Sequence, residues 1–165
     1  MILIIMGVSG VGKSTVGRLV AERLDVPYVE GDDFHSPANI ALMRRGRSLT
    51  DVHRHGWLLR LRKAIVQWHL RNQTIVLSCS SLKRSYRNML RVRGADVRYV
   101  FLTGPNRLIK KRLRMRKGHF MPASQLRKQL ITLQPPKRAI RIFINSPAHI
   151  IAKHIADKVK YGKVY

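Results

Sequence analysis

Short apolar runs alternate along the chain with longer segments in which apolar residues recur at helical spacing. Apolar runs that are rich in β-branched residues and bounded by Gly, Pro or Asn are typical of buried strands. We therefore expect five strands, over residues 2–6, 26–29, 74–78, 97–102 and 139–144. Strands that alternate with helices in this way predict an α/β fold, with a parallel sheet covered by helices on both faces.

The helical segments are amphipathic. Trp57, Leu61, Ile65 and Trp68 lie at helical spacing with cations between them, so we expect these aromatic side chains to belong to the core. Residues 16–24 and the stretch that follows Pro147 have similar patterns. Ligands of such sheets bind beyond the carboxyl ends of the strands, so motifs that follow strands carry the most weight for function.

Composition limits the class of protein. A length of 165 residues and a hydrophobic fraction of 45% fit a single domain over residues 1–165 and exclude a disordered chain. No apolar run is long enough to span a bilayer, so we expect no membrane insertion, and residues 1–6 are too short for a signal peptide. The single cysteine, Cys79, cannot form an internal disulfide and is typical of a cytoplasmic protein.

A complete phosphate-loop pattern follows the first predicted strand and opens a predicted helix. Its glycines let backbone N–H groups converge on phosphate oxygens, so we expect this loop to bind ATP. Lys13 is expected to reach the β- and γ-phosphates, and Ser14 to offer its hydroxyl to Mg²⁺. The expected nucleotide-binding residues are Gly7, Ser9, Gly10, Val11, Gly12, Lys13, Ser14 and Thr15.

Three of the eight acidic residues lie together at the end of the second predicted strand. They are Glu30, Asp32 and Asp33. A carboxylate at this place can accept a proton from a substrate hydroxyl, and another can hold water on Mg²⁺. The same residues are good turn formers, but their place at the carboxyl end of a strand favours a functional role.

The charge balance is strongly basic. Lys and Arg number 33 against 8 Asp and Glu, which gives a formal net charge of +25. Such a surface attracts polyanions without a specific site. Because the cations are spread along the chain, a solvated basic surface is the simpler interpretation, and a dedicated nucleic-acid role is the alternative.

Five further motifs follow the phosphate loop along the chain. They are Gly31-Asp32-Asp33-Phe34-His35-Ser36-Pro37-Ala38-Asn39-Ile40, Leu49-Thr50-Asp51, Trp57-Leu58, Cys79-Ser80-Ser81-Leu82-Lys83-Arg84-Ser85-Tyr86-Arg87 and Arg116-Lys117-Gly118-His119-Phe120-Met121-Pro122. Together with the phosphate loop they resemble bacterial gluconokinase and run in family order through most of the chain. That family is a P-loop kinase family similar to shikimate and nucleoside-monophosphate kinases.

The resemblance implies transfer of the γ-phosphate of ATP to the 6-hydroxyl of D-gluconate. It implies that Asp32 orients or deprotonates that hydroxyl, and that Glu30 stands in the outer shell of Mg²⁺ in place of a more usual aspartate. The gluconate-binding residues that it implies are Asp32, His35, Lys83, Arg87 and His119. The family is often dimeric, so the resemblance also implies a homodimer.

The resemblance further implies a substrate-binding helical region over residues 33–72 and a small lid over residues 113–135. Arg112 and Arg116 are four residues apart and fall on one helical face. They resemble lid arginines that clamp the ATP phosphates, and Arg116 is expected to be catalytic because it would stabilise the transferring phosphoryl group.

Some positions differ from the family. His53, Asn88, Gln134 and Asn145 stand where the family has acidic residues. The last two are expected to bear on lid closure and nucleotide affinity. Two alternatives to a gluconokinase therefore remain: a kinase of another small anionic acceptor such as shikimate or a nucleotide, and a polyanion-binding or nucleic-acid-binding protein on a kinase scaffold.

Overall fold

The computed structural model describes residues 1–115 and 123–162. Its strands are β1 (Ile2–Met6), β2 (Tyr28–Glu30), β3 (Ile75–Ser78), β4 (Val97–Thr103) and β5 (Ile140–Phe143). Its helices are α1 (Lys13–Leu24), the 3₁₀ helix η1 (Gly31–Phe34), α2 (Pro37–Arg44), α3 (Asp51–Leu70), α4 (Arg84–Leu90), α5 (Asn106–Met115), α6 (Ala123–Thr132) and α7 (Ala148–Tyr161).

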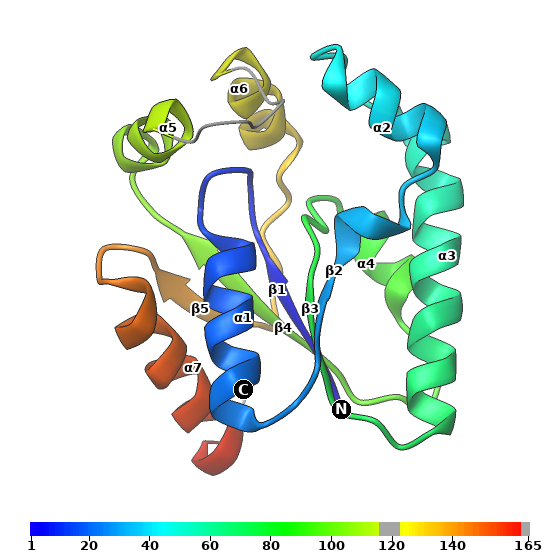
Figure 1. Cartoon of the computed structure of the whole chain (residues 1–165), viewed down its shortest axis with the longest axis vertical. Helices are drawn as coiled ribbons and strands as arrows, with labels where there is room; N and C mark the ends of the chain where they lie inside the picture. Colours follow the sequence, from blue (N-terminus) through cyan, green and yellow to red (C-terminus); the bar gives the residue numbers. More distant parts are fainter. Residues whose placement is uncertain (116–122, 163–165) are drawn as a thin grey trace.

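The five strands form one parallel sheet in the order β2-β3-β1-β4-β5 (Figure 1). This arrangement confirms the predicted α/β fold and its five-stranded parallel sheet. The connection from β1 to β2 runs toward one edge of the sheet, and the connection from β3 to β4 runs past β1 toward the other edge. Ligands of open α/β sheets bind at such a switch point. The loop after β1 lies at this point, beneath α5 and α6 (Figure 1).

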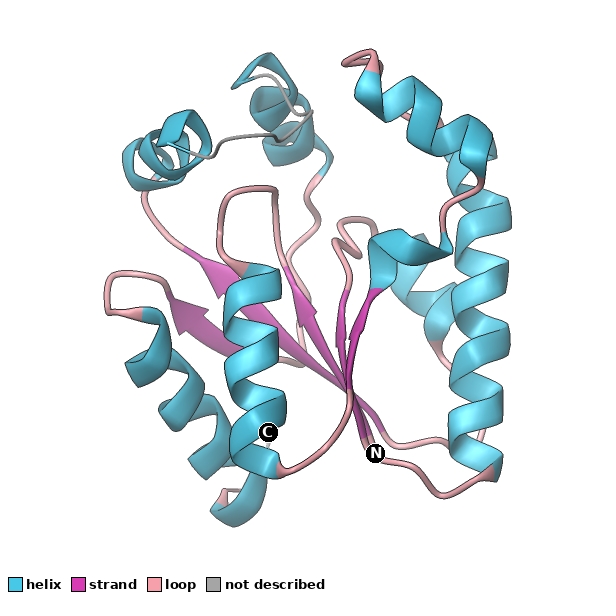
Figure 2. Cartoon of the chain, viewed as in Figure 1, coloured by secondary structure: helices cyan, strands magenta, loops and turns pink. Residues whose placement is uncertain are grey.

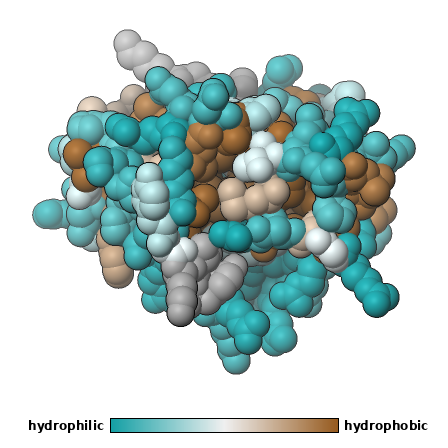
Figure 3. Space-filling model, turned by 90° about the horizontal axis from the view of Figure 1, so that it is seen from below, coloured by the Kyte–Doolittle hydropathy of each residue, from teal (hydrophilic) through white to brown (hydrophobic). Residues whose placement is uncertain are grey.

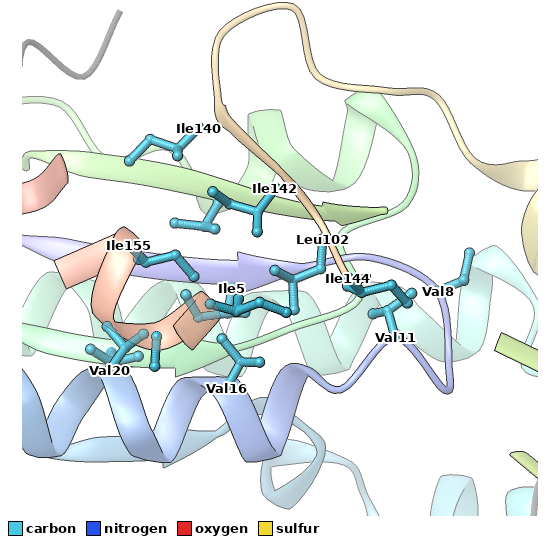
Figure 4. Packing of buried hydrophobic residues seen from close by; sticks show 14 of the residues in the cluster. Ile5, Val8, Val11, Val16, Val20, Leu102, Ile140, Ile142, Ile144 and Ile155 are labelled. Atoms are coloured by element: carbon cyan, nitrogen blue, oxygen red, sulfur yellow. The ribbon is translucent and has the colours of Figure 1, made fainter. Parts of the chain in front are cut away.

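Helices cover both faces of the sheet (Figure 2). On one face, alternate strand residues such as Ile5 and Leu102 pack against Val16 and Val20 of α1 and Ile155 of α7 (Figure 4). On the other face, the intervening strand residues pack against Trp57, Leu61 and Ile65 of α3 and against α4. The prediction that Trp57 belongs to the core is confirmed, because its side chain is 1% exposed.

Element boundaries differ slightly from the sequence prediction. Strand β2 begins at Tyr28 rather than at residue 26, because α1 ends in a left-handed residue, Asp25, and Pro27 has no N–H for the ladder. The shift places Glu30 inside the strand. Helix α1 begins at Lys13, so the phosphate-loop lysine occupies its first turn, whereas α7 follows its N-cap residue Pro147 as predicted.

The surface is mostly hydrophilic, with hydrophobic residues exposed in gaps between polar ones. Figure 3 shows this for the end of the molecule where the strands begin. None of the helices in residues 1–115 and 123–162 combines the length and the apolar character needed to cross a bilayer.

Candidate active site

The phosphate loop joins β1 to α1 and packs under α5. Gly10 has a left-handed φ of 86°, and a Cβ atom there would lie 2.7 Å from Cγ of Leu113. Only glycine therefore lets the loop take this path beneath the helix. Lys13 Nζ donates a hydrogen bond to the carbonyl of Val8 at 3.2 Å, and Lys13 stands in the first turn of α1, whose N-terminus adjoins the loop.

Glu30 lies beside the start of α1 in a cluster of hydroxyl groups. Its carboxylate accepts hydrogen bonds from Tyr28 at 2.6 Å and from Ser78, and the Ser14 hydroxyl is near enough to lower its pKa. Burial by itself raises the pKa of Glu30. The hydrogen bonds from Ser78 and Tyr28, with the Ser14 hydroxyl and the charge of Lys13, outweigh that effect and leave the pKa of Glu30 below its ordinary value.

This cluster fits a magnesium ion bound together with a nucleotide. Mg²⁺ prefers oxygen ligands and commonly uses one or two protein groups, with water and phosphate oxygens completing its shell. The ionised carboxylate of Glu30 and the hydroxyl of Ser14 are such ligands, and they lie together at the start of α1.

The turn after β2 presents Asp32. Gly31 opens the turn, and a Cβ atom on Gly31 would lie only 2.3 Å from the carbonyl oxygen of Ser78. Trp57 Nε1 donates to the carbonyl of Gly31 at 2.7 Å and so ties the turn to α3. The side chain of Asp32 is 64% exposed, and its carboxylate lies 3.8 Å from Nε2 of His35.

His35 is buried and neutral. Its ring stacks on Trp57, with ring centroids 4.5 Å apart. Asn39 Nδ2 donates to the carbonyl of His53 at 2.8 Å, and the same nitrogen is 3.3 Å from Nδ1 of His35. Because an amide nitrogen only donates, Nδ1 accepts and the ring proton sits on Nε2, on the side of Asp32.

Acidification is expected to destabilise the protein through His35. Burial, together with the smaller effects of the charges of Arg54 and Arg60, lowers the pKa of His35 from 6.5 to about 4. The unfolded chain therefore binds more protons than the folded chain between these values, and stability falls as the pH drops from 6.5 toward 4. The shift corresponds to about 3 kcal/mol at most.

The measurement is denaturant unfolding at pH 7.5 and at pH 5 for the wild type and for His35→Phe, which keeps a ring against Trp57. We expect the variant to lose less stability on acidification than the wild type does. Equal losses in the two proteins would show that His35 does not carry the pH dependence.

Lys83 and Asp51 close the other side of the site. Lys83 Nζ lies 2.5 Å from the Asp51 carboxylate, which also accepts a hydrogen bond from Tyr86. The hydrogen bond from Lys83 holds the pKa of Asp51 below its ordinary value. Asp51 begins α3 and Lys83 caps α4, so this ion pair joins two elements at the mouth of the site.

A cavity of about 660 Å³ joins these groups. The loop after β1, the η1 turn, α2, the start of α3 and α6 all contribute to its walls, and Figure 1 shows α2 and α6 on opposite sides of the opening. Five of the sequence-predicted residues line it, namely Ser9, Lys13, Asp32, His35 and Lys83. The cavity therefore brings the phosphate loop and the acidic turn together around one space.

Two of the arginines predicted to bind ligands donate hydrogen bonds to backbone carbonyls in this structure. Arg87 donates to the carbonyls of Ser81, at 2.8 Å, and Leu82, at 3.1 Å, and it does not line the cavity. Arg112 donates to the carbonyls of Val11, at 3.3 Å, and Ile144, at 3.0 Å, so it connects α5 to the phosphate loop. The predicted residues Arg116 and His119 lie outside the described residues.

Two of the departures from the family keep a hydrogen-bond acceptor. Nδ1 of His53 accepts from the backbone N–H of Thr50 at 3.1 Å and completes a capping box at the start of α3. Oε1 of Gln134 accepts from the backbone N–H of Arg84 at 2.7 Å, at the start of α4. Both contacts are ones that a carboxylate would also make, so these replacements preserve the local structure.

Two further residues of the site have no role that the sequence predicts. Oε1 of Gln129 in α6 accepts a hydrogen bond from the phosphate-loop N–H of Ser9 at 2.7 Å. Asp51 belongs to the motif Leu49-Thr50-Asp51, for which the sequence predicts no function. No local signal marks Gln129, because its partner lies 120 residues away.

Comparison with known proteins settles the family. The AAA domain model matches residues 2–136. A gluconokinase of Gluconobacter oxydans is 44% identical over 81% of this chain and 75% of its own length. The thermosensitive gluconokinase of Escherichia coli is 40% identical over 86% of this chain and 78% of its own length. The chain belongs to the gluconokinase family. This confirms the family predicted from the motifs.

Solved structures agree with this family. The structure of a gluconokinase from Sinorhizobium meliloti superposes with a TM-score of 0.81 at 37% identity, covering 96% of this chain and 95% of the other. An APS kinase of Mycobacterium tuberculosis has a TM-score of 0.74 at 21% identity over 96% of both chains, which shows a shared fold. The gluconokinase family thus shares its P-loop kinase scaffold with more distant kinases.

Proposed function

We propose that the chain transfers the γ-phosphoryl group of ATP to the 6-hydroxyl of D-gluconate, with Mg²⁺ bound alongside the nucleotide. The observation that carries this proposal is the shared cavity: Lys13 and Asp32 face the same space, and Lys83 lies on its wall. A sugar-acid kinase has three requirements. It needs a group that binds the phosphoryl donor, a carboxylate that can take a proton, and a cation that can bind the acid.

Each residue has a distinct task in this proposal. Lys13 and the loop N–H groups bind the β- and γ-phosphates, and Lys13 offsets the charge that develops on the transferring group. Asp32 accepts the proton of the attacking hydroxyl or orients it. His35 supports Asp32 because Nε2 of its neutral ring, which carries the proton, lies 3.8 Å from that carboxylate.

Ser14 and Glu30 would hold Mg²⁺, Ser14 through its hydroxyl and Glu30 through a water molecule. The ion supplies charge neutralisation at the phosphate oxygens. The low pKa of Glu30 keeps its carboxylate ionised for this task at neutral pH.

Lys83 is expected to bind the carboxylate of gluconate. Its ammonium group has three protons, so it can hold Asp51 and still donate to the substrate. Replacement by Met removes a hydrogen bond to a charged group, which is worth about 1.5–3 kcal/mol, and we expect KM for gluconate to rise at least about tenfold with kcat changed less.

Steady-state kinetics with varied gluconate measure this effect. Arg84→Met is the matched control, because Arg84 is the neighbouring cation and does not line the cavity. A similar rise of KM in both variants would mean that lost positive charge, rather than the Lys83 contact, weakens binding.

The experiment that tests the function is ATP-dependent phosphorylation with Mg²⁺, run on D-gluconate beside shikimate, other sugar acids and nucleoside monophosphates. Turnover selective for gluconate supports the proposal. Selective turnover of another acid would replace it by a kinase of a different small anion. Binding of ATP without turnover of any acceptor would overturn the kinase function.

A further inference from the structure

The positive charge of the molecule is unevenly placed. All carboxylate side chains lie at or before Asp96 or at Asp157, so the intervening residues 97–156 have none. This acid-free stretch builds β4, α5, α6, β5 and the start of α7, which Figure 1 shows on the side of the sheet away from α2 and α3. Ion pairs join Arg98 to Asp96 and Lys153 to Asp157 at the two ends of the stretch, and α5 lies between these ends in the sequence.

Helix α5 has two opposite faces. Its apolar face, Ile109 and Leu113, is buried against the phosphate loop at Gly10. Its outer face carries Arg107, Lys110, Lys111 and Arg114, spaced by three, four and seven residues, so these four cations form one stripe. All four are exposed, and none takes part in an ion pair within the described part of the chain.

The stripe lines a hollow of its own. The four cations and Met115 border a space of about 630 Å³, and none of them lines the substrate cavity. Residues seven apart on a helix are separated by about 10 Å along its axis, a span along which one strand of a duplex presents about three phosphates. A row of cations at this spacing, without ion pairs among residues 1–115 and 123–162, suits a chain of phosphates better than a single small anion.

We propose that the outer face of α5 is a binding surface for a phosphate chain, the backbone of a nucleic acid or polyphosphate, separate from the kinase site. Such a surface neutralises phosphates without reading bases. An anionic membrane fits less well, because a helix that lies on a membrane needs an exposed apolar face and that of α5 is buried.

The test compares two variants of equal charge. One carries Gln at Arg107, Lys110, Lys111 and Arg114. The control carries Gln at four exposed cations elsewhere, namely Lys63, Arg71, Arg91 and Arg93. Each variant lowers the formal charge from +25 to +21. Fluorescence anisotropy measures the binding of a 20-nucleotide RNA, a 20-base-pair DNA duplex and a labelled polyphosphate across a range of salt concentrations.

We expect the α5 variant to bind the preferred polymer at least about tenfold more weakly near physiological salt, and the slope of log K against log salt to flatten by about 3 for single strands. The control is expected to change far less. The polymer that is bound most tightly identifies the source of the phosphates. Both variants are expected to phosphorylate gluconate as the wild type does, which shows that they fold.

Equal weakening by the two variants would overturn the proposal, because net charge alone would then account for binding. Binding of vesicles of anionic phospholipid that is as tight as that of the polymers, and equally sensitive to the α5 changes, would also overturn it.

Discussion

Replacing Lys13 by alanine is expected to lower kcat about a thousandfold, which is the order of effect seen when one preorganised donor to a developing charge is removed. Lys13 stands in the first turn of α1, and its ammonium group contacts the carbonyl of Val8 within the loop. No other cation starts from the loop itself, so a neighbour cannot easily take over its position. A coupled assay of ADP release with gluconate measures the loss.

Lys128→Ala is the matched control, because Lys128 also lines the cavity but comes from α6. We expect this control to retain most of the activity. If both variants lost activity to the same extent, the general positive potential of the cavity would matter and the specific contact of Lys13 with phosphate would not.

Asp32→Asn is expected to reduce kcat by about 10²–10⁴, the usual contribution of a positioned acid or base, with KM for gluconate changed much less. An amide keeps the size of the carboxylate and the contact distance to His35, but it cannot take a proton. Since Asp32 is largely exposed, with its side chain 64% accessible, the substitution should leave the fold intact.

Asp33→Asn is the control for Asp32→Asn. It removes one negative charge from the neighbouring residue, so it shows whether the loss of kcat depends on the position of Asp32 or on charge alone. Asp33 is the next residue along and lines the same cavity. We expect it to retain near-normal kcat. Retention of full turnover by Asp32→Asn would remove Asp32 from the chemistry and leave it a role in binding at most.

The fold and the phosphate loop were predictable because their signals are local. The loop pattern is contiguous and its flanking strand and helix are periodic, so neighbouring residues carry the whole inference. Asp32 was predictable for a related reason: parallel strands end at one edge, and a carboxylate after β2 must lie near the loop after β1.

The pairings within the site were not predictable. Lys83 forms an ion pair with Asp51, 32 residues away in the sequence, and the N–H of Ser9 donates a hydrogen bond to Gln129, 120 residues away. Such contacts depend on how α3, α4 and α6 pack, which periodicity does not specify. For Arg87, the ligand contact that the motif implies stays a prediction, and its guanidinium donates hydrogen bonds to two carbonyls of the loop that precedes α4.

In the phosphate loop, the N–H of Ser9 already donates a hydrogen bond to Gln129, so another acceptor can take this N–H only by replacing Gln129. If a phosphate oxygen did so, an arriving nucleotide would gain only the difference between the two acceptors. Under that condition the nucleotide and this contact of α6 compete, and each weakens the other by the same factor. A change that draws α6 away from the loop would then tighten nucleotide binding without touching a nucleotide contact.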